Sequence, residues 1–327
     1  MEPFGTTRAG ADVAAIPLRA GRLSARILTL GAILQDLRLD AQPLTLGSAD
    51  LAAYDNGPLQ HFGAVIGPVA GRLRDGQGGL AGRSLKLSTG PHPHALHCER
   101  HGLHRAIWSV ADAGGAHVRL ETAAAPGAGG LPGARRFAAT YALSETALRL
   151  TLEAETDAAT WINLTHHGYW RLGAAPGLDG HRLQIAAERH LPIDADTLPT
   201  GDIAPVAGTR FDFRDARVLA PTDRIDHCFC LSEAETAPRA VAAFTAPDGM
   251  ALSVYSTSPG LQIFTGDGVS SGAYPGHDGQ PYHSRPGLAI EPQGWPDAPN
   301  HPSFPSIEVG PGQAWRREIA WQIDPPQ

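Results

Sequence analysis

Charge is scarce in this sequence of 327 residues. Charged residues make up 18% of the chain, the formal net charge is −7, and no long basic or acidic run occurs. Nucleic acids and anionic membrane surfaces bind proteins through clustered positive charge. The composition therefore argues against a nucleic-acid partner and against a membrane-surface partner.

Cysteine and long apolar runs are also lacking. The three cysteines, Cys98, Cys228 and Cys230, cannot form an even disulfide framework, and a chain of this length buries a large core without one. This usage fits a reducing compartment. No apolar run is long enough to cross a membrane or to form the core of a signal peptide. We therefore predict a cytoplasmic protein.

Glycine and proline, in contrast, are abundant and spread along the whole chain, with 38 and 28 residues. Such dispersion is typical of many short strands joined by turns. A bend is expected at Gly31, and turns are expected at 144–146 and 248–249. A period-two alternation of apolar and polar residues predicts strands in residues 25–39, 136–156, 181–194, 239–256 and 314–323.

A helical pattern is confined to residues 48–56 (SADLAAYDN), where Ser48 is the expected N-cap. No repeat and no low-complexity linker divides the chain. The sequence therefore predicts an all-β fold, a large antiparallel β-sandwich, as a single domain over residues 1–327.

Residues 92–104 (HPHALHCERHGLH) contain five histidines, which raises the question of a metal site. A zinc-protease helix requires the pattern His-Glu-x-x-His, whereas Glu99 comes one place too late after His97. Loop histidines without a spacing signature are usually solvated, so we expect no metal. The alternative is a loop site with distant ligands that uses His94, His97, Cys98 or His101.

Residues 160–172 (TWINLTHHGYWRL) have the composition of a strand. Alternation then assigns one face to Ile162, Leu164, His166, Trp170 and Leu172, which resembles a core face. The opposite face receives Trp161, Asn163, Thr165, His167 and Tyr169. Aromatic rings beside amide and hydroxyl groups suit a sugar. The alternative is that His167 is an ordinary half-buried strand histidine.

Two carboxylates occupy positions next to apolar runs. Glu291 follows such a run and precedes Pro292, so we expect it at a strand end, where partial desolvation raises its pKa toward that of a useful base. Asp226 and His227 stand just before a short apolar strand. The alternatives are a surface glutamate at a turn and ordinary turn chemistry.

In order and across nearly the whole chain, these segments resemble the aldose 1-epimerase (galactose mutarotase) family. VIGPVAGRL resembles the family's loop that ends in an Asn-Arg pair, with Arg72 as the arginine. ALHCERHGLHRAIW resembles its Leu-His-Gly-Gly segment, with His97 as the histidine. NLTHHGYWRL is similar to its Asn-Leu-Thr-Asn-His-Ser-Tyr segment, with His167 at the catalytic histidine.

Three further matches follow along the chain. DHCFCL supplies Asp226, and SPGLQIFTGD supplies Gln262. GLAIEPQGWPDAPNHPSFPS is the closest match of all and has Glu291 at the catalytic glutamate. Each motif alone is weak, but six in the same order make the resemblance specific.

The resemblance implies a supersandwich type of β-sandwich with a sugar cleft on a concave face. It implies a cofactor-free and metal-free isomerase of carbohydrate metabolism that interconverts the α and β anomers of a free aldose. Glu291 would act as the base on the C1 hydroxyl, and His167 as the acid on the ring oxygen. The expected partner is a monosaccharide, and the expected state is a monomer or homodimer. The implied sugar-binding residues are Arg72, His97, Asp226 and Gln262.

Several positions depart from the family pattern. Gly71 replaces the asparagine before the arginine, Pro68 replaces an earlier arginine, and His166 replaces the asparagine before the catalytic histidine. Cys98 and Glu99 replace two glycines. The acid and the base are retained, so the reaction class is unchanged. The identity of the aldose stays open among galactose, glucose, arabinose, xylose and a modified sugar.

Two other functions stay open at this point. Asp226 and Glu291 could be the carboxylate pair of a glycoside hydrolase. The same scaffold could also serve a non-catalytic sugar-binding or sensing protein. A binding module has no need of an acid–base pair, so Glu291 and His167 together favour the enzyme.

Overall fold

The computed structural model describes residues 1–90, 92–173 and 177–326. Within these ranges the chain forms antiparallel strands, and its helical elements are single 3-10 turns. The predicted all-β class is confirmed. The turns are η1 (Leu51–Ala53), η2 (Arg74–Gly76), η3 (Glu99–His101), η4 (Leu103–Arg105), η5 (Ala128–Gly130) and η6 (Ala298–Asn300).

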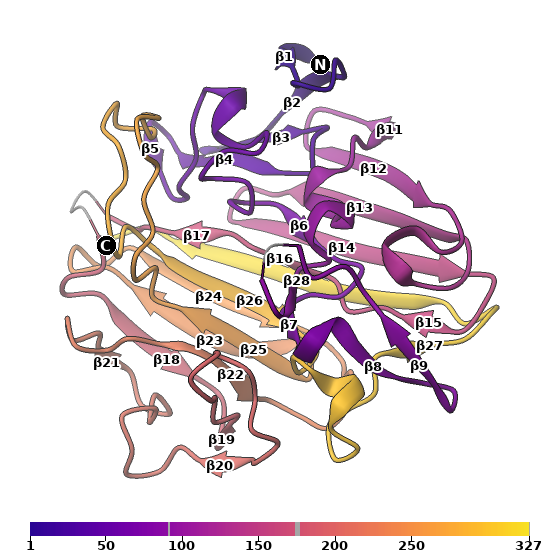
Figure 1. Cartoon of the computed structure of the whole chain (residues 1–327). Helices are drawn as coiled ribbons and strands as arrows, with labels where there is room; N and C mark the ends of the chain where they lie inside the picture. Colours follow the sequence, from indigo (N-terminus) through magenta and orange to yellow (C-terminus); the bar gives the residue numbers. More distant parts are fainter. Residues whose placement is uncertain (91, 174–176, 327) are drawn as a thin grey trace.

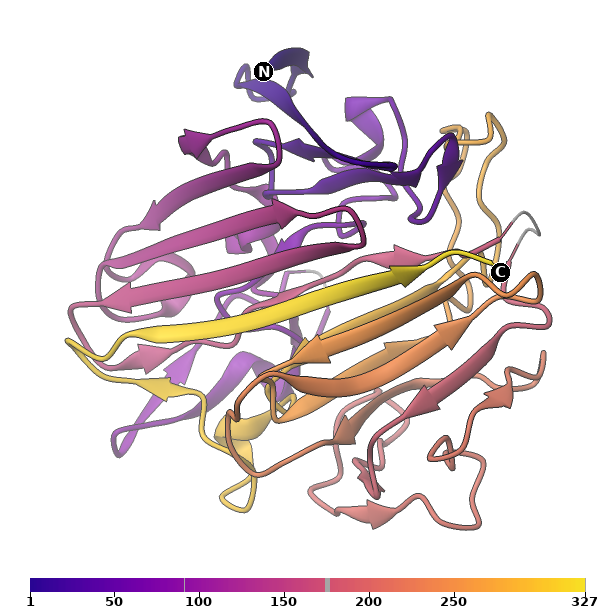
Figure 2. The ribbon, with the colours of Figure 1, turned by 180° about the vertical axis from the view of Figure 1, so that it is seen from behind.

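The largest sheet has nine strands, and the C-terminal strand joins its two halves. Figure 2 shows this strand, in yellow, between the magenta and the orange strands. The order is β11 (Ser109–Ala113), β12 (His117–Ala124), β13 (Arg135–Leu143), β14 (Ala147–Thr156), β28 (Trp315–Asp324), β24 (Ala251–Ser256), β23 (Arg239–Thr245), β18 (Arg182–Ile185) and β21 (Arg217–Val218).

A second sheet of six strands lies on the other side of the core and faces the viewer in Figure 1. Its order is β17 (Tyr169–Trp170), β26 (Leu288–Gln293), β25 (Gly260–Phe264), β22 (Asp226–Cys230), β19 (Arg189–His190) and β20 (Ala204–Pro205). The N-terminal residues form a five-stranded meander of β1 (Glu2–Thr6), β2 (Asp12–Ala20), β3 (Leu23–Leu28), β4 (Leu34–Leu39) and β5 (Gln42–Pro43).

Four short strand pairs join the loops around the six-stranded sheet. They are β7 (Arg72–Leu73) with β10 (Ala95–Leu96), β8 (Gln77–Leu80) with β9 (Arg83–Lys86), β6 (Val65–Ile66) with β16 (Thr165–His166), and β15 (Thr160–Trp161) with β27 (Glu308–Val309).

The main core lies between the two large sheets. Leu150, Leu252 and Trp321 of the nine-stranded sheet belong to the same buried cluster as Ile263 and Ile290 of the six-stranded sheet. Burying each aliphatic side chain of this size contributes about 1.5–3 kcal/mol. Because alternate residues of a strand point to opposite faces, the side chains between these core residues point away from it. The core-free face of the six-stranded sheet is therefore available for a site.

The predicted turns are confirmed. Gly31 has a φ of 62° between β3 and β4, and a Cβ there would lie 2.5 Å from the His104 carbonyl oxygen, so glycine fits the bend. Residues 144–146 connect β13 to β14, and residues 248–249 lie between β23 and β24. No helix among the described residues is long and apolar enough to cross a membrane.

The predicted helix over residues 48–56 is wrong. Only the three residues of η1 are helical, and Asp50 caps this turn by accepting a hydrogen bond from the Ala52 N–H at 2.9 Å. Ser48 is buried, and its N–H donates to the Tyr54 hydroxyl. Asn56 takes a left-handed φ of 59°, which turns the chain before a second helical turn can form.

The segment 160–172 is not one strand, because β15, β16 and β17 pair with three different partners. The predicted core face is nevertheless confirmed, since His166 is fully buried with its ring 4.9 Å from that of Trp321. The side chains predicted for the opposite face lie in two different places. His167 and Tyr169 line a pocket, whereas Trp161 packs in a separate buried cluster.

Candidate active site

A pocket of about 170 Å³ lies on the face of the six-stranded sheet that points away from the main core. Its floor is built by alternation along the central strands. Gln262 of β25 stands opposite both Glu291 of β26 and Cys228 of β22, so the three side chains share one face. Asp226, two residues before Cys228, points the same way. The other walls come from His61, Arg72, His97, His167, Tyr169 and the loop 191–199.

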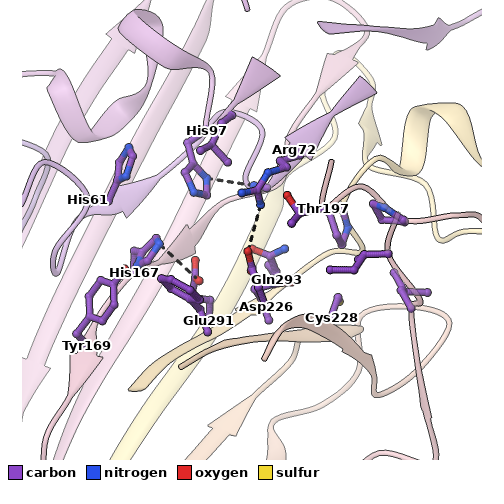
Figure 3. Close-up of a pocket in the computed structure, with 18 residues that line it drawn as sticks. His61, Arg72, His97, His167, Tyr169, Thr197, Asp226, Cys228, Glu291 and Gln293 are labelled. Atoms are coloured by element: carbon purple, nitrogen blue, oxygen red, sulfur yellow. Dashed lines mark hydrogen bonds and ion pairs between the residues drawn. The ribbon is translucent and has the colours of Figure 1, made fainter. Parts of the chain in front are cut away.

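Glu291 and His167 meet inside this pocket (Figure 3). The Oε1 atom of Glu291 lies 3.6 Å from Nε2 of His167, and both side chains are buried. Burial raises the pKa of Glu291 well above its ordinary value, an effect that nearby Asp226 reinforces and Arg72 opposes. Burial, together with His61, lowers the pKa of His167 to about 3. The two pKa shifts favour a neutral carboxyl and a neutral imidazole, so the pair together carries one titratable proton.

The prediction that Glu291 stands at a strand end is wrong, because it is the fourth of the six residues of β26. The strand continues through Pro292 for a structural reason. The Pro292 carbonyl accepts a hydrogen bond from Thr165 Oγ1 at 2.8 Å, so this residue's polar backbone faces away from β25. Its missing N–H therefore removes no bond of the β25–β26 ladder. Glu291, with a relative exposure of 2%, is buried within the strand and not partly desolvated at its end.

Asp226, Arg72 and Gln262 form a polar group beside the pair. The Gln262 amide donates to Asp226 Oδ1 at 2.6 Å, and Arg72 Nη1 lies 3.5 Å from Asp226 Oδ2. Burial raises the pKa of Asp226, while Arg72 and Gln262 act in the opposite direction. The side chains of Asp226 and Arg72 keep 29% and 31% of their surface exposed. They can therefore reach a ligand.

His97 is held in one tautomer by the neighbouring loop. Its Nδ1 accepts a hydrogen bond from the Gly71 N–H at 3.1 Å, and the Gly71 carbonyl accepts from the His97 N–H. Burial and the neighbouring histidines lower the pKa of His97 well below its ordinary value, so the ring is neutral. A neutral ring that accepts at Nδ1 carries its proton on Nε2. His97 therefore offers a hydrogen-bond donor.

Cys98 and Glu99, which depart from the family pattern after His97, contact the backbone of neighbouring residues. The Cys98 thiol contacts the Val69 backbone, with the Val69 N–H 3.2 Å from Sγ, and burial raises the pKa of this thiol to about 12. Glu99 accepts from the Leu96 N–H. Neither belongs to the described residues that line the pocket. Of the five histidines in residues 92–104, His97 alone lines it, and no described group of three or more His, Cys, Asp or Glu side chains has the arrangement of a metal site.

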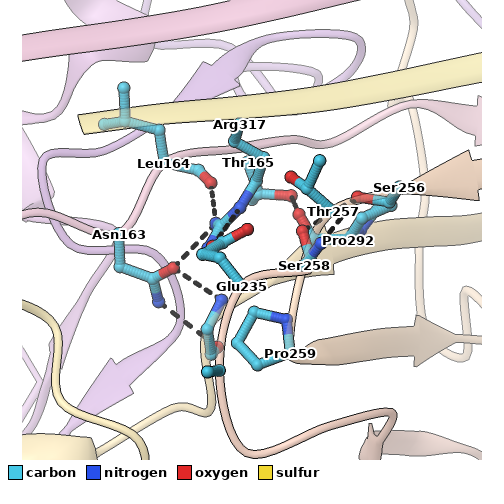
Figure 4. A network of polar contacts seen from close by, with 12 residues as sticks. Asn163, Leu164, Thr165, Glu235, Ser256, Thr257, Ser258, Pro259, Pro292 and Arg317 are labelled. Carbon is cyan, nitrogen blue, oxygen red and sulfur yellow. Dashed lines mark hydrogen bonds and ion pairs between the residues drawn. The ribbon is translucent and has the colours of Figure 1, made fainter. Parts of the chain in front are cut away.

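A buried polar network fixes the segment before His167 to the segment after Glu291 (Figure 4). The Asn163 amide donates to the Gly294 carbonyl, and Asn163 Oδ1 accepts from the Gly294 N–H at 2.7 Å. Arg317 donates to the same Oδ1 at 3.0 Å and to the Leu164 carbonyl, and it pairs with Glu235. These bonds hold the His167 and Glu291 segments in a fixed relation from behind the pocket.

All six predicted site residues line this one pocket: Arg72, His97, His167, Asp226, Gln262 and Glu291. The sequence reasoning missed His61 and Gln293. The His61 ring stacks on His167 with centroids 5.9 Å apart, and burial lowers its pKa to about 4. No local pattern distinguished His61. Gln293 could have been found, because it follows Glu291 by two residues and so shares its face.

Comparison with known proteins agrees with this geometry. A family model described as aldose 1-epimerase matches residues 15–322. Galactose mutarotase of Rattus norvegicus is 33% identical over 324 residues, covering 94% of this chain and 92% of the relative. Aldose 1-epimerase of Escherichia coli (strain K12) is 31% identical, covering 96% and 92%.

A solved structure of an aldose epimerase homologue from C. elegans covers 96% of this chain and 100% of its own, with a TM-score of 0.88 and 25% identity. The predicted β-sandwich of the galactose mutarotase type is thus confirmed. The chain belongs to the aldose 1-epimerase family, isomerases that act on small aldose sugars.

Proposed function

We propose that this protein interconverts the α and β anomers of a free monosaccharide, with Glu291 as the base and His167 as the acid. The observation that carries the proposal is the buried pair itself. A carboxylate oxygen and an imidazole nitrogen 3.6 Å apart line one small pocket together with several hydrogen-bonding side chains. Ring opening needs one group to take a proton and a second group to supply one.

The proposed reaction balances its protons within the pair. Glu291 takes the proton of the C1 hydroxyl while His167 gives its proton to the ring oxygen, and the bond from C1 to the ring oxygen breaks. Rotation about C1–C2 then presents the other face of the aldehyde. On closure Glu291 returns its proton to the carbonyl oxygen, and His167 recovers one from the C5 hydroxyl.

Burial supports the direction of these transfers. The reactive form of the pair is an ionised carboxylate and an imidazolium, which the free pocket reaches when the shared proton passes from Glu291 to His167 across their 3.6 Å separation. After ring opening the pair is a neutral carboxyl and a neutral imidazole. The raised pKa of Glu291 and the lowered pKa of His167 both favour the second form. The pocket therefore favours proton transfer toward the open chain.

The remaining polar residues suit the binding of sugar hydroxyls. Asp226 can accept from hydroxyl groups and is oriented by the Gln262 amide, and Arg72 can only donate. His97 offers its Nε2 proton. Fixed donors and acceptors of this kind hold a ring in one register, which places C1 and its two oxygens against the acid and the base.

The test is anomer exchange, followed by polarimetry or saturation-transfer NMR. Galactose, glucose, arabinose, xylose and one anionic sugar are compared for the wild type, Glu291→Gln and His167→Ala. We expect rapid exchange of at least one neutral aldose and a loss of about 10²–10⁴-fold in both variants. Thermal unfolding of each variant confirms that it is folded.

Other outcomes would point to the alternatives. A folded wild type that accelerates no aldose but binds one favours the sugar-binding protein. Glycoside cleavage that survives in His167→Ala but not in Glu291→Gln favours a hydrolase based on Asp226 and Glu291. We also propose that residues 1–327 form one domain, supported by a core cluster whose members run from Ile16 to Ile323.

A further inference from the structure

One buried amide in the pocket has no role in the reaction above. Gln293 lines the pocket with a relative exposure of 1%, and neither its Oε1 nor its Nε2 has a hydrogen-bond partner among the described residues. A buried polar group without a partner costs about 1–3 kcal/mol. This cost to the stability of the folded protein persists unless a ligand supplies the missing hydrogen bonds.

The position of Gln293 on β26 indicates which part of a sugar it can reach. It follows Glu291 by two residues, so both side chains point to the same face about 7 Å apart along the strand. This separation is larger than the distance from C1 to C4 of a pyranose ring, and the hydroxyls that project from the ring can bridge the remainder. With C1 held at Glu291, Gln293 faces the end of the ring remote from the reaction. Figure 3 labels Gln293 on the side of the pocket that holds Arg72 and Asp226.

The neighbouring glycine places no side chain against the buried amide. Gly71 lines the pocket with a φ of 80°, and a Cβ there would lie 3.5 Å from Gln293 Nε2 and 2.9 Å from Pro296 Cβ. An asparagine, the residue that the family pattern has at this position, would place its side chain in this region. Gly71 thus spares the Gln293 amide the further cover that a side chain at this position would add.

We infer that Gln293 is a further sugar-binding residue, which pairs its amide with a hydroxyl on the side of the ring opposite the anomeric carbon. The inference rests on the proposed mutarotase function and sharpens it. The amide offers an acceptor and two donors on one rotatable group. Because these groups are buried, a sugar that lacks the hydroxyl leaves them unpaired. Gln293 therefore selects for the presence and configuration of that hydroxyl.

The experiment combines one change in the protein with one change in the sugar, as in a double-mutant cycle. Gln293→Leu removes the amide at similar volume, and the variant is compared with the wild type on the best aldose and on its 3-deoxy, 4-deoxy and 6-deoxy forms. We expect KM for the parent sugar to rise on the order of tenfold, with little change in kcat, because the contact is remote from C1. For the deoxy sugar that lacks the partner hydroxyl, the same substitution should change KM by less than about twofold.

A matched control is Gln35→Leu, because Gln35 is also buried but binds the Ser48 carbonyl outside the pocket. This control should leave KM and the ranking of the sugars unchanged. If Gln293→Leu does not fold, Gln293→Met serves in its place. An equal effect of the Gln293 substitution on the parent and on every deoxy sugar, or no effect on any of them, overturns the inference.

Failure of the proposed function gives a different result. A wild type that exchanges the anomers of no aldose contradicts mutarotase activity. Calorimetric binding of the same sugars to the wild type and to Gln293→Leu then still measures the contact. A loss of affinity confined to sugars that carry the hydroxyl supports it, and a uniform loss or no loss overturns it.

Discussion

The two faces of the six-stranded sheet come from the same strands and have opposite chemistry. On β26, Ile290 packs into the main core while Glu291, the next residue, enters the pocket. The adjacent histidines before β17 repeat this division, with His166 against Trp321 and His167 against Glu291. The comparison shows how period-two alternation supports a buried, polar site on a rigid apolar layer.

The largest expected effect is on the pocket face. Glu291→Gln keeps the shape of the side chain and removes the proposed base, so the anomer-exchange rate should fall by about 10²–10⁴-fold. Stability should change little, because burial already favours the neutral form of this group. Saturation-transfer NMR and thermal unfolding measure the two quantities. A rate within tenfold of the wild type would contradict the role of Glu291 as the base.

Substitution of the preceding residue, Ile290, should have the opposite result, a loss of stability with little loss of rate. Ile290→Ala removes buried carbons from the main core, which should cost about 2–5 kcal/mol of the free energy of unfolding. The rate per folded molecule should stay within a few-fold of the wild type, since Ile290 does not line the pocket. Denaturant unfolding and active-site titration separate the two effects. A rate loss equal to that of Glu291→Gln would remove the distinction between the faces.

The network behind the pocket should give an intermediate effect. Asn163→Ala removes both bonds to Gly294, and we expect kcat to fall about tenfold with KM nearly constant. Asn163→Asp keeps the acceptor for Gly294 and Arg317 and should restore part of the rate. Ser256→Ala, which removes a buried hydroxyl that bonds the Glu318 carbonyl, is the control for a purely structural loss. Equal kinetics for Asn163→Ala and Ser256→Ala would show that Asn163 does not position the pair.

The last expected effect concerns the pH dependence of stability, not the rate. Burial lowers the pKa values of His166 and His167 to about 3 and those of His61 and His227 to about 4. The unfolded chain therefore binds more protons than the folded one between about pH 6.5 and 4, so stability should fall as the pH falls. Each histidine contributes up to about 1.4 kcal/mol per pH unit. Glu291 acts in the opposite sense above pH 4.5.

His166→Asn isolates one of these contributions. The variant should flatten the decline in the free energy of unfolding between pH 6.5 and 4, measured by urea titration at several pH values. His117→Asn is the control, because His117 is partly exposed on β12. An unchanged slope in His166→Asn would contradict a buried, neutral His166.

Much of this arrangement could be predicted from the sequence because alternation is a local signal. The strands around Gly31 and over 136–156 follow from it, and so does the assignment of His166 to the core. The candidate site residues follow only from motif resemblance, since no local pattern indicates that Arg72 and Asp226, 154 positions apart, lie within 3.5 Å of each other.

The failures also have physical causes. Residues 48–56 have a helical composition, but the left-handed backbone of Asn56 turns the chain soon after the single turn η1. The segment 160–172 alternates correctly yet divides among three pairing partners, which long-range contacts decide. Pro292 predicts a break after Glu291, but the strand continues because the Pro292 carbonyl bonds Thr165 on the side away from β25.

The most direct test of the acid–base pair compares the two adjacent histidines. The anomer-exchange rate is measured by saturation-transfer NMR for His166→Asn and His167→Asn on the best aldose, with both variants shown to be folded. We predict a loss of at least about hundredfold for His167→Asn and less than about threefold for His166→Asn. Retained activity in His167→Asn, or a larger loss in His166→Asn, would contradict the assignment of His167 as the acid.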